Sequence, residues 1–279
     1  IPVFLVTLSG YLMTLKSDVS KSVLLSILVL FTTYTGFAIF SGISIIIILF
    51  SYVLRSHSKF RLANISALLI AIIAFLSFLH DYKFMPAVSC YKFPHDSLIE
   101  YFTFSASQFG KAFGIHYVLS GYKTILLSAP IFGVLLYVSA FFTIRFLKNT
   151  DQKNQLIFYF SSFTILFIVF TAIGRVCLGP GASMASRYIP YSLFGILAIY
   201  FGGLQVFEEY QIKPLFKTII IGLFIFSLFL KETTIVFYQE HINWLKTGKV
   251  EWVECYLETQ NIENSDSLVF VNGTPESNF

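Results

Sequence analysis

The stretch that decides the fold begins with QLIFYFSSFTILFIVFTAI at Gln155, continues through GRVCLGPGASMASRY, Gly174 to Tyr188, and ends with IPYSLFGILAIYFGGL at Leu204. The outer pieces are apolar runs that approach or reach the roughly 17–25 residues with which a helix crosses a bilayer. In hydrocarbon every backbone amide has to be paired within its own segment, so such runs predict helices. The middle piece interrupts them with two arginines, a Gly-Pro-Gly triplet and two serines. The stretch therefore predicts two membrane helices joined by a short polar connection.

The composition of the whole chain agrees with a membrane protein. Of 279 residues, 56% are hydrophobic and 12% are charged, about half of the roughly 25% found in soluble domains. The mean hydropathy is +0.75. A soluble protein with so few polar side chains could not cover its surface with them, so we exclude that class. We predict an all-α fold, a polytopic transmembrane helix bundle whose partner is the lipid bilayer and which binds no nucleic acid.

Apolar runs bounded by charged residues predict about seven or eight spans: 1–14, 21–34, 37–54, 63–80, 124–147, 155–174, 188–207 and 215–231. The run from 21 to 54 is too long for one crossing at about 1.5 Å rise per residue, and Gly36 weakens a helix inside TTYTGFAIFSG, so we divide it. The chain starts at Ile1 with residues that are already typical of a membrane helix. We therefore expect that upstream spans are lacking.

The distribution of lysine and arginine predicts which loops face the cytoplasm, because cytoplasmic loops carry an excess of both. RSHSKFRL at 55–62 and RFLKNTDQKN at 145–154 are assigned to that side, and LKSDVSK at 15–21 and EEYQIKPLFK at 208–217 then join them. The outer side receives the remaining connections: the turn at 36–37, the long loop 81–123, the loop 175–187 and the tail.

Two regions are expected along the chain. Residues 1–231 form the transmembrane bundle with its extracytoplasmic loop, and residues 232–279 form an amphipathic extracytoplasmic tail. Within the tail, residues 235–258 favour one or two amphipathic helices, with Trp244 and Trp252 at the level of the lipid headgroups. SLVFVNG at 267–273 is typical of a short strand and turn.

A helix is also predicted inside the outer loop, in HDSLIEYFTFSASQFGKAF at 95–113. The apolar spacing suits a helix that lies in the membrane interface with one face toward lipid or the bundle. The residues of that face are Leu98, Ile99, Phe102, Phe109 and Phe113. Asp96, which follows Pro94, is the expected N-terminal cap of this helix.

The three cysteines, Cys90, Cys177 and Cys255, form no CxxC pair, which argues against a zinc or redox motif. All three fall on the predicted outer side, where a disulfide is conceivable. Because an odd number of cysteines cannot pair completely, we expect unpaired small side chains and keep a disulfide as the alternative.

The candidate binding site is built on Arg175 and Arg187, which stand at the two ends of the polar connection. A guanidinium can pair with a phosphate through two hydrogen bonds, and the amides of LGPGAS have no bulky side chains to keep an anion away. We predict a site for the phosphate or diphosphate of a lipid-linked substrate. The alternative is that both arginines extend to ordinary lipid headgroups, that the Gly-Pro-Gly triplet is only a turn, and that Tyr188 is an interface anchor.

Catalytic candidates carry a weaker signal. Asp81 follows His80, Asp96 follows His95, and Glu100 is placed to share a helix face with Asp96. Carboxylates and imidazoles together can bind a divalent cation such as Mg or Mn, or move a proton. The spacing matches no metal-ligand signature, so capping and solvation of the interface are the alternative, and no metal ligand is assigned.

A family resemblance adds to these predictions. GRVCLGPGASMASRYIPYSLFGILAIYFGGL resembles a late segment of bacterial multi-spanning proteins with the GT-C glycosyltransferase-like architecture, in which a helix ends with Gly-Arg and Ser-Arg-Tyr opens the next one. TTYTGFAIFSGISIIIILFSYVL resembles their earlier Ser/Thr-aromatic-Gly turn, and EYFTFSASQFGKAFG resembles the end of their extracytoplasmic loop. The similarity is spread over 30–231. It implies a bacterial inner (plasma) membrane transferase that takes a sugar from a polyprenyl-phosphate donor at the outer face, as in cell-envelope polysaccharide synthesis.

The resemblance implies phosphate-binding roles for Gly174, Arg175, Ser186, Arg187 and Tyr188. Enzymes of this architecture carry their catalytic acidic residue in the first outer loop, which would lie upstream, so the catalytic base stays unknown. Three alternatives remain open. One is a polysaccharide polymerase or ligase that uses a lipid diphosphate donor. Another is a non-enzymatic transporter or flippase, which would need charged residues at mid-depth, and the predicted spans contain none. The third is a structural or assembly partner, which an upstream region without an acidic outer loop would favour.

Overall fold

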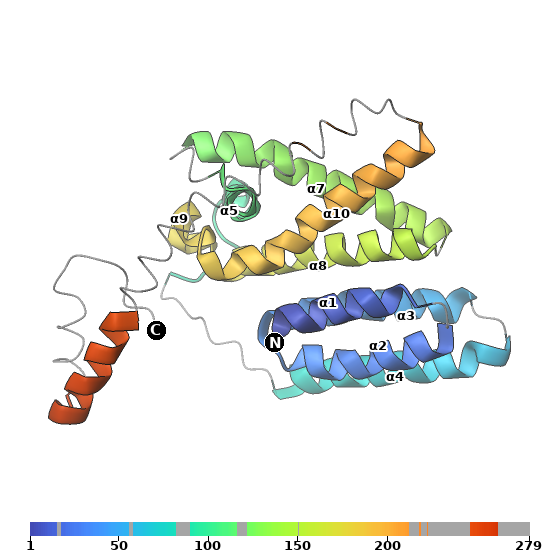
Figure 1. The fold of residues 1–279 in the computed structure, drawn as a ribbon, viewed down its shortest axis with the longest axis horizontal. Coiled ribbons are helices and arrows are strands. Elements are labelled where there is room, and N and C mark those ends of the chain that lie inside the picture. Colours follow the sequence, from blue (N-terminus) through green and yellow to red (C-terminus); the bar gives the residue numbers. More distant parts are fainter. Residues whose placement is uncertain are drawn as a thin grey trace. The chain divides into compact units, whose positions relative to one another are not determined.

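The computed structural model describes residues 1–15, 18–55, 58–81, 90–115, 122–149, 151–211, 218, 222 and 246–261, and every regular element in these ranges is a helix (Figure 1). This confirms the all-α prediction. In chain order the elements of the first 211 residues are α1 (Pro2–Met13), α2 (Asp18–Thr33), η1 (Gly36–Ala38), α3 (Ile39–Arg55), α4 (Ser58–Asp81), α5 (Leu98–Ala112), α7 (Tyr122–Lys148), α8 (Gln152–Arg175), η2 (Val176–Leu178), α9 (Gly179–Ser183), η3 (Ser186–Tyr188) and α10 (Ile189–Glu209). The chain divides into two units, Ile1–Ile221 and Gly222–Phe279, which are described separately.

Five helical segments of the described chain are long and apolar enough to cross a membrane: Gly36–Arg55, Phe60–His80, Tyr122–Lys148, Gln152–Ser183 and Ile189–Glu209. They establish an integral membrane protein. The two other apolar helices, α1 and α2, are shorter, and a helix with the 16 residues of α2 extends about 24 Å against a hydrocarbon core of about 30 Å. The predicted span at 215–231 lies almost wholly outside the described residues.

The division of the long apolar run at 21–54 is confirmed. α2 ends at Thr33, and the amide of Thr35 bonds to the carbonyl of Thr32 at 3.2 Å. Gly36 then adopts φ +50°, a left-handed conformation in which a side chain would be strained. This single residue turns the chain so that α3 returns beside α2.

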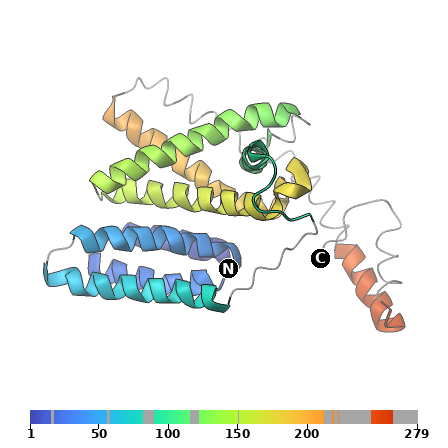
Figure 2. The ribbon, with the colours of Figure 1, turned by 180° about the vertical axis from the view of Figure 1, so that it is seen from behind.

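Within the first unit the helices pack in two groups, which Figures 1 and 2 show from opposite sides. α1, α2, α3 and α4 form one group and α7, α8 and α10 form the other, while α1 and α3 both contact α8. One buried apolar core runs through both groups and includes Val6, Leu25, Ile48, Phe146 and Phe163. Because lipid is as apolar as these side chains, close packing holds the groups together more than exclusion of water does.

Helix α5 differs from the sequence prediction. An interfacial helix would bury one face, but all nine residues from Phe104 to Ala112 are buried, and the helix packs against α7, α8, α9 and α10. Of the expected apolar face, Phe109 is fully buried, whereas Leu98 and Ile99 are 77% and 64% exposed. The first turn therefore projects from the bundle while the rest of α5 is inserted into it.

In the second unit the structure describes Gly222 and residues 246–261, and residues 246–259 form a helix. Its Trp252 ring stacks on Tyr256, with centroids 5.3 Å apart. This confirms the predicted tail helix for the described part. The remainder of the predicted helical segment and the predicted strand at 267–273 lie outside the described residues.

Candidate functional site

Contacts between connections define two ends of the bundle. At the lysine-rich end, which contains Arg55, Lys148, Lys153, Glu208 and Glu209, Arg55 donates to the carbonyl of Phe146 at 3.1 Å. The side-chain Nε2 of Gln152 donates to the backbone carbonyl of Leu15 at 3.1 Å, and Arg145 pairs with Glu209 at 2.5 Å. The connections that sequence analysis assigned to one compartment are therefore brought together at one end.

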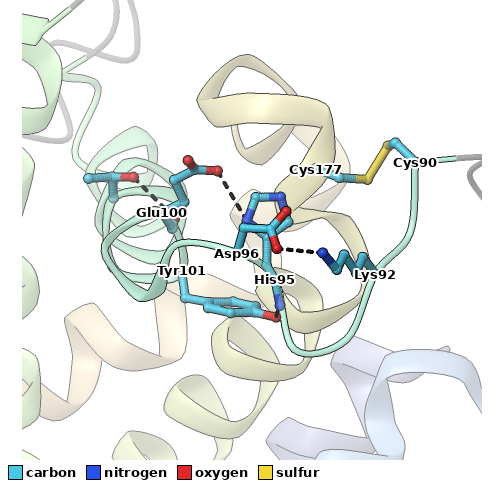
Figure 3. Close-up of polar contacts among 8 residues, drawn as sticks. Cys90, Lys92, His95, Asp96, Glu100, Tyr101 and Cys177 are labelled. Carbon is cyan, nitrogen blue, oxygen red and sulfur yellow. Dashed lines mark hydrogen bonds and ion pairs between the residues drawn. A yellow bond between two sulfur atoms is a disulfide. The ribbon is translucent and has the colours of Figure 1, made fainter.

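The opposite end, here called the disulfide end, contains Phe37, Cys90, Cys177, Arg175 and Arg187. Cys90 and Cys177 are joined by a disulfide with their Cα atoms 5.8 Å apart (Figure 3). The expectation that these two cysteines are unpaired is therefore wrong, because the fold brings two residues 87 positions apart into bonding distance. Cys255 is free.

Two further links hold α5 to the segment that carries the arginines. The ammonium of Lys111 donates to the backbone carbonyl of Met184. Phe104 packs with Ala172 and Val176 in a small buried cluster. Lys111 is buried, and burial lowers the pKa of its ammonium. The short connection is therefore fastened on one side by a disulfide and on the other by a buried cation.

The two predicted arginines converge on one aromatic ring. The guanidinium carbon of Arg187 lies 5.4 Å from the ring centroid of Tyr188, and that of Arg175 lies 6.0 Å from it. These distances are in the range of cation–π attraction. Tyr188 itself is 1% exposed, and its ring meets Phe167 and Phe37 edge-on at 5.9 and 6.1 Å. A rigid aromatic platform from three parts of the chain thus sets the position of both cations.

Neither arginine pairs with a carboxylate within the described part of the chain. Arg187 is exposed and Arg175 is partly exposed. Two cations without carboxylate partners favour the approach of an anion. A guanidinium in this state can pair with the oxygens of an anion through two hydrogen bonds.

Buried polar atoms at the disulfide end lack partners among the described residues. They include the hydroxyl of Tyr188 and both amide atoms of Gln108, which is 2% exposed. Gln108 lies one turn from Phe104 and Lys111, on the face of α5 that meets the arginine segment. Sequence analysis missed Gln108, although a glutamine between Phe104 and Phe109 was the available signal.

The Gly-Pro-Gly connection is more ordered than an open loop. It folds into η2 and the five-residue helix α9, with Gly179 at φ +78°. The predicted cradle of free amides is therefore replaced by helical turns. A Cβ at Gly174 would meet nothing within 4 Å, so packing alone does not require glycine there. Ser186 opens η3, and its side chain is outside what the structure describes.

The polar residues before α5 form different pairs from those expected (Figure 3). The Nδ1 atom of His95 is 3.3 Å from Glu100, although the two do not have hydrogen-bond geometry. The backbone amide of His95 donates to the hydroxyl of Tyr101 at 2.8 Å. Lys92 pairs with Asp96 at 2.5 Å, and its hydrogen bond and charge lower the pKa of that carboxyl.

Two expectations for Asp96 are corrected. Ser97 occupies the N-cap position of α5 and Leu98 is the first helical residue, so Asp96 neither caps the helix nor shares a face with Glu100. The described residues contain no group of three His, Cys, Asp or Glu side chains that could hold a metal ion. The side chain of Asp81 lies outside the described part.

Comparison of the chain with protein-family models, with curated proteins and with solved structures found no match. The class that the fold defines is therefore the broad one, an integral membrane protein with an all-α bundle.

The two ends lead to a prediction about sidedness. Cysteines that replace Lys148 and Arg187, each in a Cys255→Ser background, will react with a membrane-impermeant maleimide from opposite sides, because one span, α8, separates them. We expect labelling at position 187 in intact cells and at 148 only after the membrane is opened. Labelling of both positions from one side would overturn the assignment.

Proposed function

We propose that this chain is part of a membrane glycosyltransferase of GT-C-like architecture, and that Arg175 and Arg187 hold the phosphate of a polyprenyl-phosphate-linked sugar at the extracytoplasmic face. The observation that carries the proposal is the convergence of two guanidinium groups, without carboxylate partners in the described chain, on the buried ring of Tyr188.

The position of the site supports this donor. Arg175 ends a membrane-length helix and Arg187 precedes the next one, so both lie where an acyl chain can stay in the bilayer while its phosphate reaches the cations. The disulfide at the same end is typical of an oxidising, extracytoplasmic compartment. Lipid-linked sugar donors of this kind are used on that side in the family that the sequence resembles.

The proposed chemistry uses the arginines on the leaving group. An acceptor hydroxyl oxygen bonds to the anomeric carbon of the sugar, and the bond from that carbon to the phosphate oxygen breaks. The phosphate leaves with the electron pair, and the two cations stabilise its growing charge in a partly dehydrated site. The base that takes the hydroxyl proton is not assigned. Glu100 and Asp96 are exposed and each lies beside a cationic or imidazole group, which suits orientation of an acceptor.

Two alternatives differ in what the site must do. A polymerase or ligase would place a diphosphate on the same arginines. The binding test described below therefore compares a monophosphate donor with a diphosphate donor. A transporter would need charged side chains deep in the bundle. Among the described side chains, the buried charged ones are Lys21 and Lys111, and both lie near helix ends. This distribution favours chemistry at the membrane surface.

The test measures transfer of labelled sugar and binding of polyprenyl phosphate by membranes that carry the full-length protein. We expect Arg187→Ala to weaken donor binding by about tenfold, the size of one lost charged hydrogen bond. Arg187→Lys should recover only part of it, because an ammonium lacks the planar fork. Lys123→Ala is the matched control, since this exposed lysine starts α7 at the same end.

The outcomes separate the hypotheses. If Arg187→Ala weakens binding of the monophosphate donor, the proposal is supported. If it weakens binding of a diphosphate donor only, the polymerase or ligase is supported. If Arg187→Ala and Lys123→Ala bind both donors as the parent does, the phosphate site is excluded.

A further inference from the structure

A cavity at the lysine-rich end lies between α8 and α10. Its volume is about 190 Å³. One water molecule needs only about 10–15 Å³ of such space, so this cavity has room for a larger ligand. The lining side chains used below are Lys153, Leu156, Phe201, Leu204, Gln205 and Glu208.

The lining has a polar mouth and an apolar interior. Lys153 and Glu208, next to the helix ends, form an ion pair at 3.4 Å, and both remain more than half exposed. Leu156 and Leu204, one turn deeper, and Phe201, two turns deeper, present hydrocarbon. This order of groups, charged and then apolar, follows the order of groups in a phospholipid that enters from the membrane surface.

One buried acceptor in the lining lacks a partner in the described chain. The amide nitrogen of Gln205 donates to the side-chain oxygen of Asn154 at 2.9 Å, which leaves the amide oxygen of Gln205 facing no donor. A buried acceptor without a donor is destabilising, so a ligand that supplies a donor is favoured. Gln205 and Glu208 are three residues apart on α10, so their side chains lie on the same face of the helix, the face that lines the cavity.

The helix ends complement a ligand with separated charges. α8 begins at Gln152 and α10 ends at Glu209, so the positive end of one helix dipole and the negative end of another meet at the mouth. Lys153 adds a cation at the first and Glu208 an anion at the second. The neighbouring charges Arg145 and Glu209 neutralise each other in their own pair. Lys153 and Glu208 pair with each other, so a zwitterion can replace that ion pair without leaving either charge unpaired, whereas an anion bound to Lys153 would leave Glu208 unpaired.

We propose that this cavity binds one phosphatidylethanolamine molecule. Lys153 and the start of α8 take the phosphate, and Glu208 and the Gln205 amide oxygen accept hydrogen bonds from the primary ammonium. The first methylene groups of an acyl chain occupy the apolar interior. A choline headgroup carries the same charges but has no N–H to donate, and a glycerol headgroup lacks the cation, so both are bound less tightly.

The test counts lipids bound to the purified, delipidated full chain by native mass spectrometry. Phosphatidylethanolamine, its N-methyl and N,N-dimethyl derivatives and phosphatidylcholine are compared at equal chain length, with phosphatidylglycerol as the anionic arm. We expect one tight site, with ethanolamine bound about tenfold more tightly than choline and affinity falling as N–H groups are replaced. Glu208→Gln and Gln205→Leu should each abolish this preference.

The control variant is Glu209→Gln. Its carboxylate is next in sequence but pairs with Arg145 and does not line the cavity, so the headgroup preference should persist. Equal binding of ethanolamine and choline lipids, tighter binding of phosphatidylglycerol, or identical behaviour of Glu208→Gln and Glu209→Gln would each overturn the proposal. The arginine site lies at the other end of the bundle, so its own test is unaffected by this result.

Discussion

Gly110→Ala will lower the free energy of unfolding by about 3 kcal/mol, the upper part of the usual range for overpacking. A Cβ at Gly110 would lie 1.9 Å from the hydroxyl oxygen of Ser128 and 2.5 Å from its Cβ. Serine is too short to move its Cβ without its backbone, so α5 and α7 would have to separate. Because α5 is buried among four helices, that movement disturbs the disulfide end as a whole.

The expected signal is a fall of roughly 6–12 °C in the thermal midpoint in detergent, for a chain of this size. Gly133→Ala on α7 is the matched control, because a Cβ there meets nothing within 4 Å. The double variant Gly110→Ala/Ser128→Gly should recover most of the loss by moving the methyl group to the other helix. If Gly110→Ala and Gly133→Ala melt alike, the close approach of α5 and α7 is wrong.

Cys177→Ser will also destabilise the chain strongly. The disulfide closes a loop with a sequence separation of 87 residues, and a loop of this size corresponds to about 4.5 kcal/mol in the chain-entropy model. The loss arises because the unfolded chain regains the freedom that the bond had removed. Reductant should therefore lower the thermal midpoint of the parent chain to that of Cys177→Ser.

Cysteine variants supply the controls for this experiment. Cys255→Ser should melt like the parent, because Cys255 is free, and Cys90→Ser should match Cys177→Ser. The thermal midpoint of the double variant Cys90→Ser/Cys177→Ser should equal that of either single variant. If reductant does not change the thermal midpoint of the parent chain, the disulfide between Cys90 and Cys177 is wrong.

Much of the fold could be predicted because it depends on local properties. The length of each apolar run predicts a span. Gly36 predicts the turn between α2 and α3, which the length of the run at 21–54 could not locate. The burial of α5 could not be predicted in the same way. Ser107, Gln108 and Lys111 are polar, which is typical of a surface helix, yet the packing of four neighbouring helices encloses them. Burial of a helix on all sides is a property of its neighbours.

The candidate site was predicted in part. Arg175 and Arg187 were recognised from charge between apolar runs, but their convergence on Tyr188 depends on Phe167 and Phe37, which belong to distant segments. The pairing of Cys90 with Cys177 could not be predicted, because three cysteines allow several pairings and sequence gives no distances. The cavity beside Gln205 has no sequence signature, since it exists only between two packed helices.

The disulfide has a consequence for biogenesis. Cys90 precedes and Cys177 follows the pair of spans α7 and α8, so both thiols reach the same compartment when both spans are inserted. If one of the two spans fails to insert, Cys177 lies across the bilayer from Cys90 and the bond cannot form. Oxidation of the two thiols to the disulfide is thus a covalent record that α7 and α8 entered the membrane as a pair.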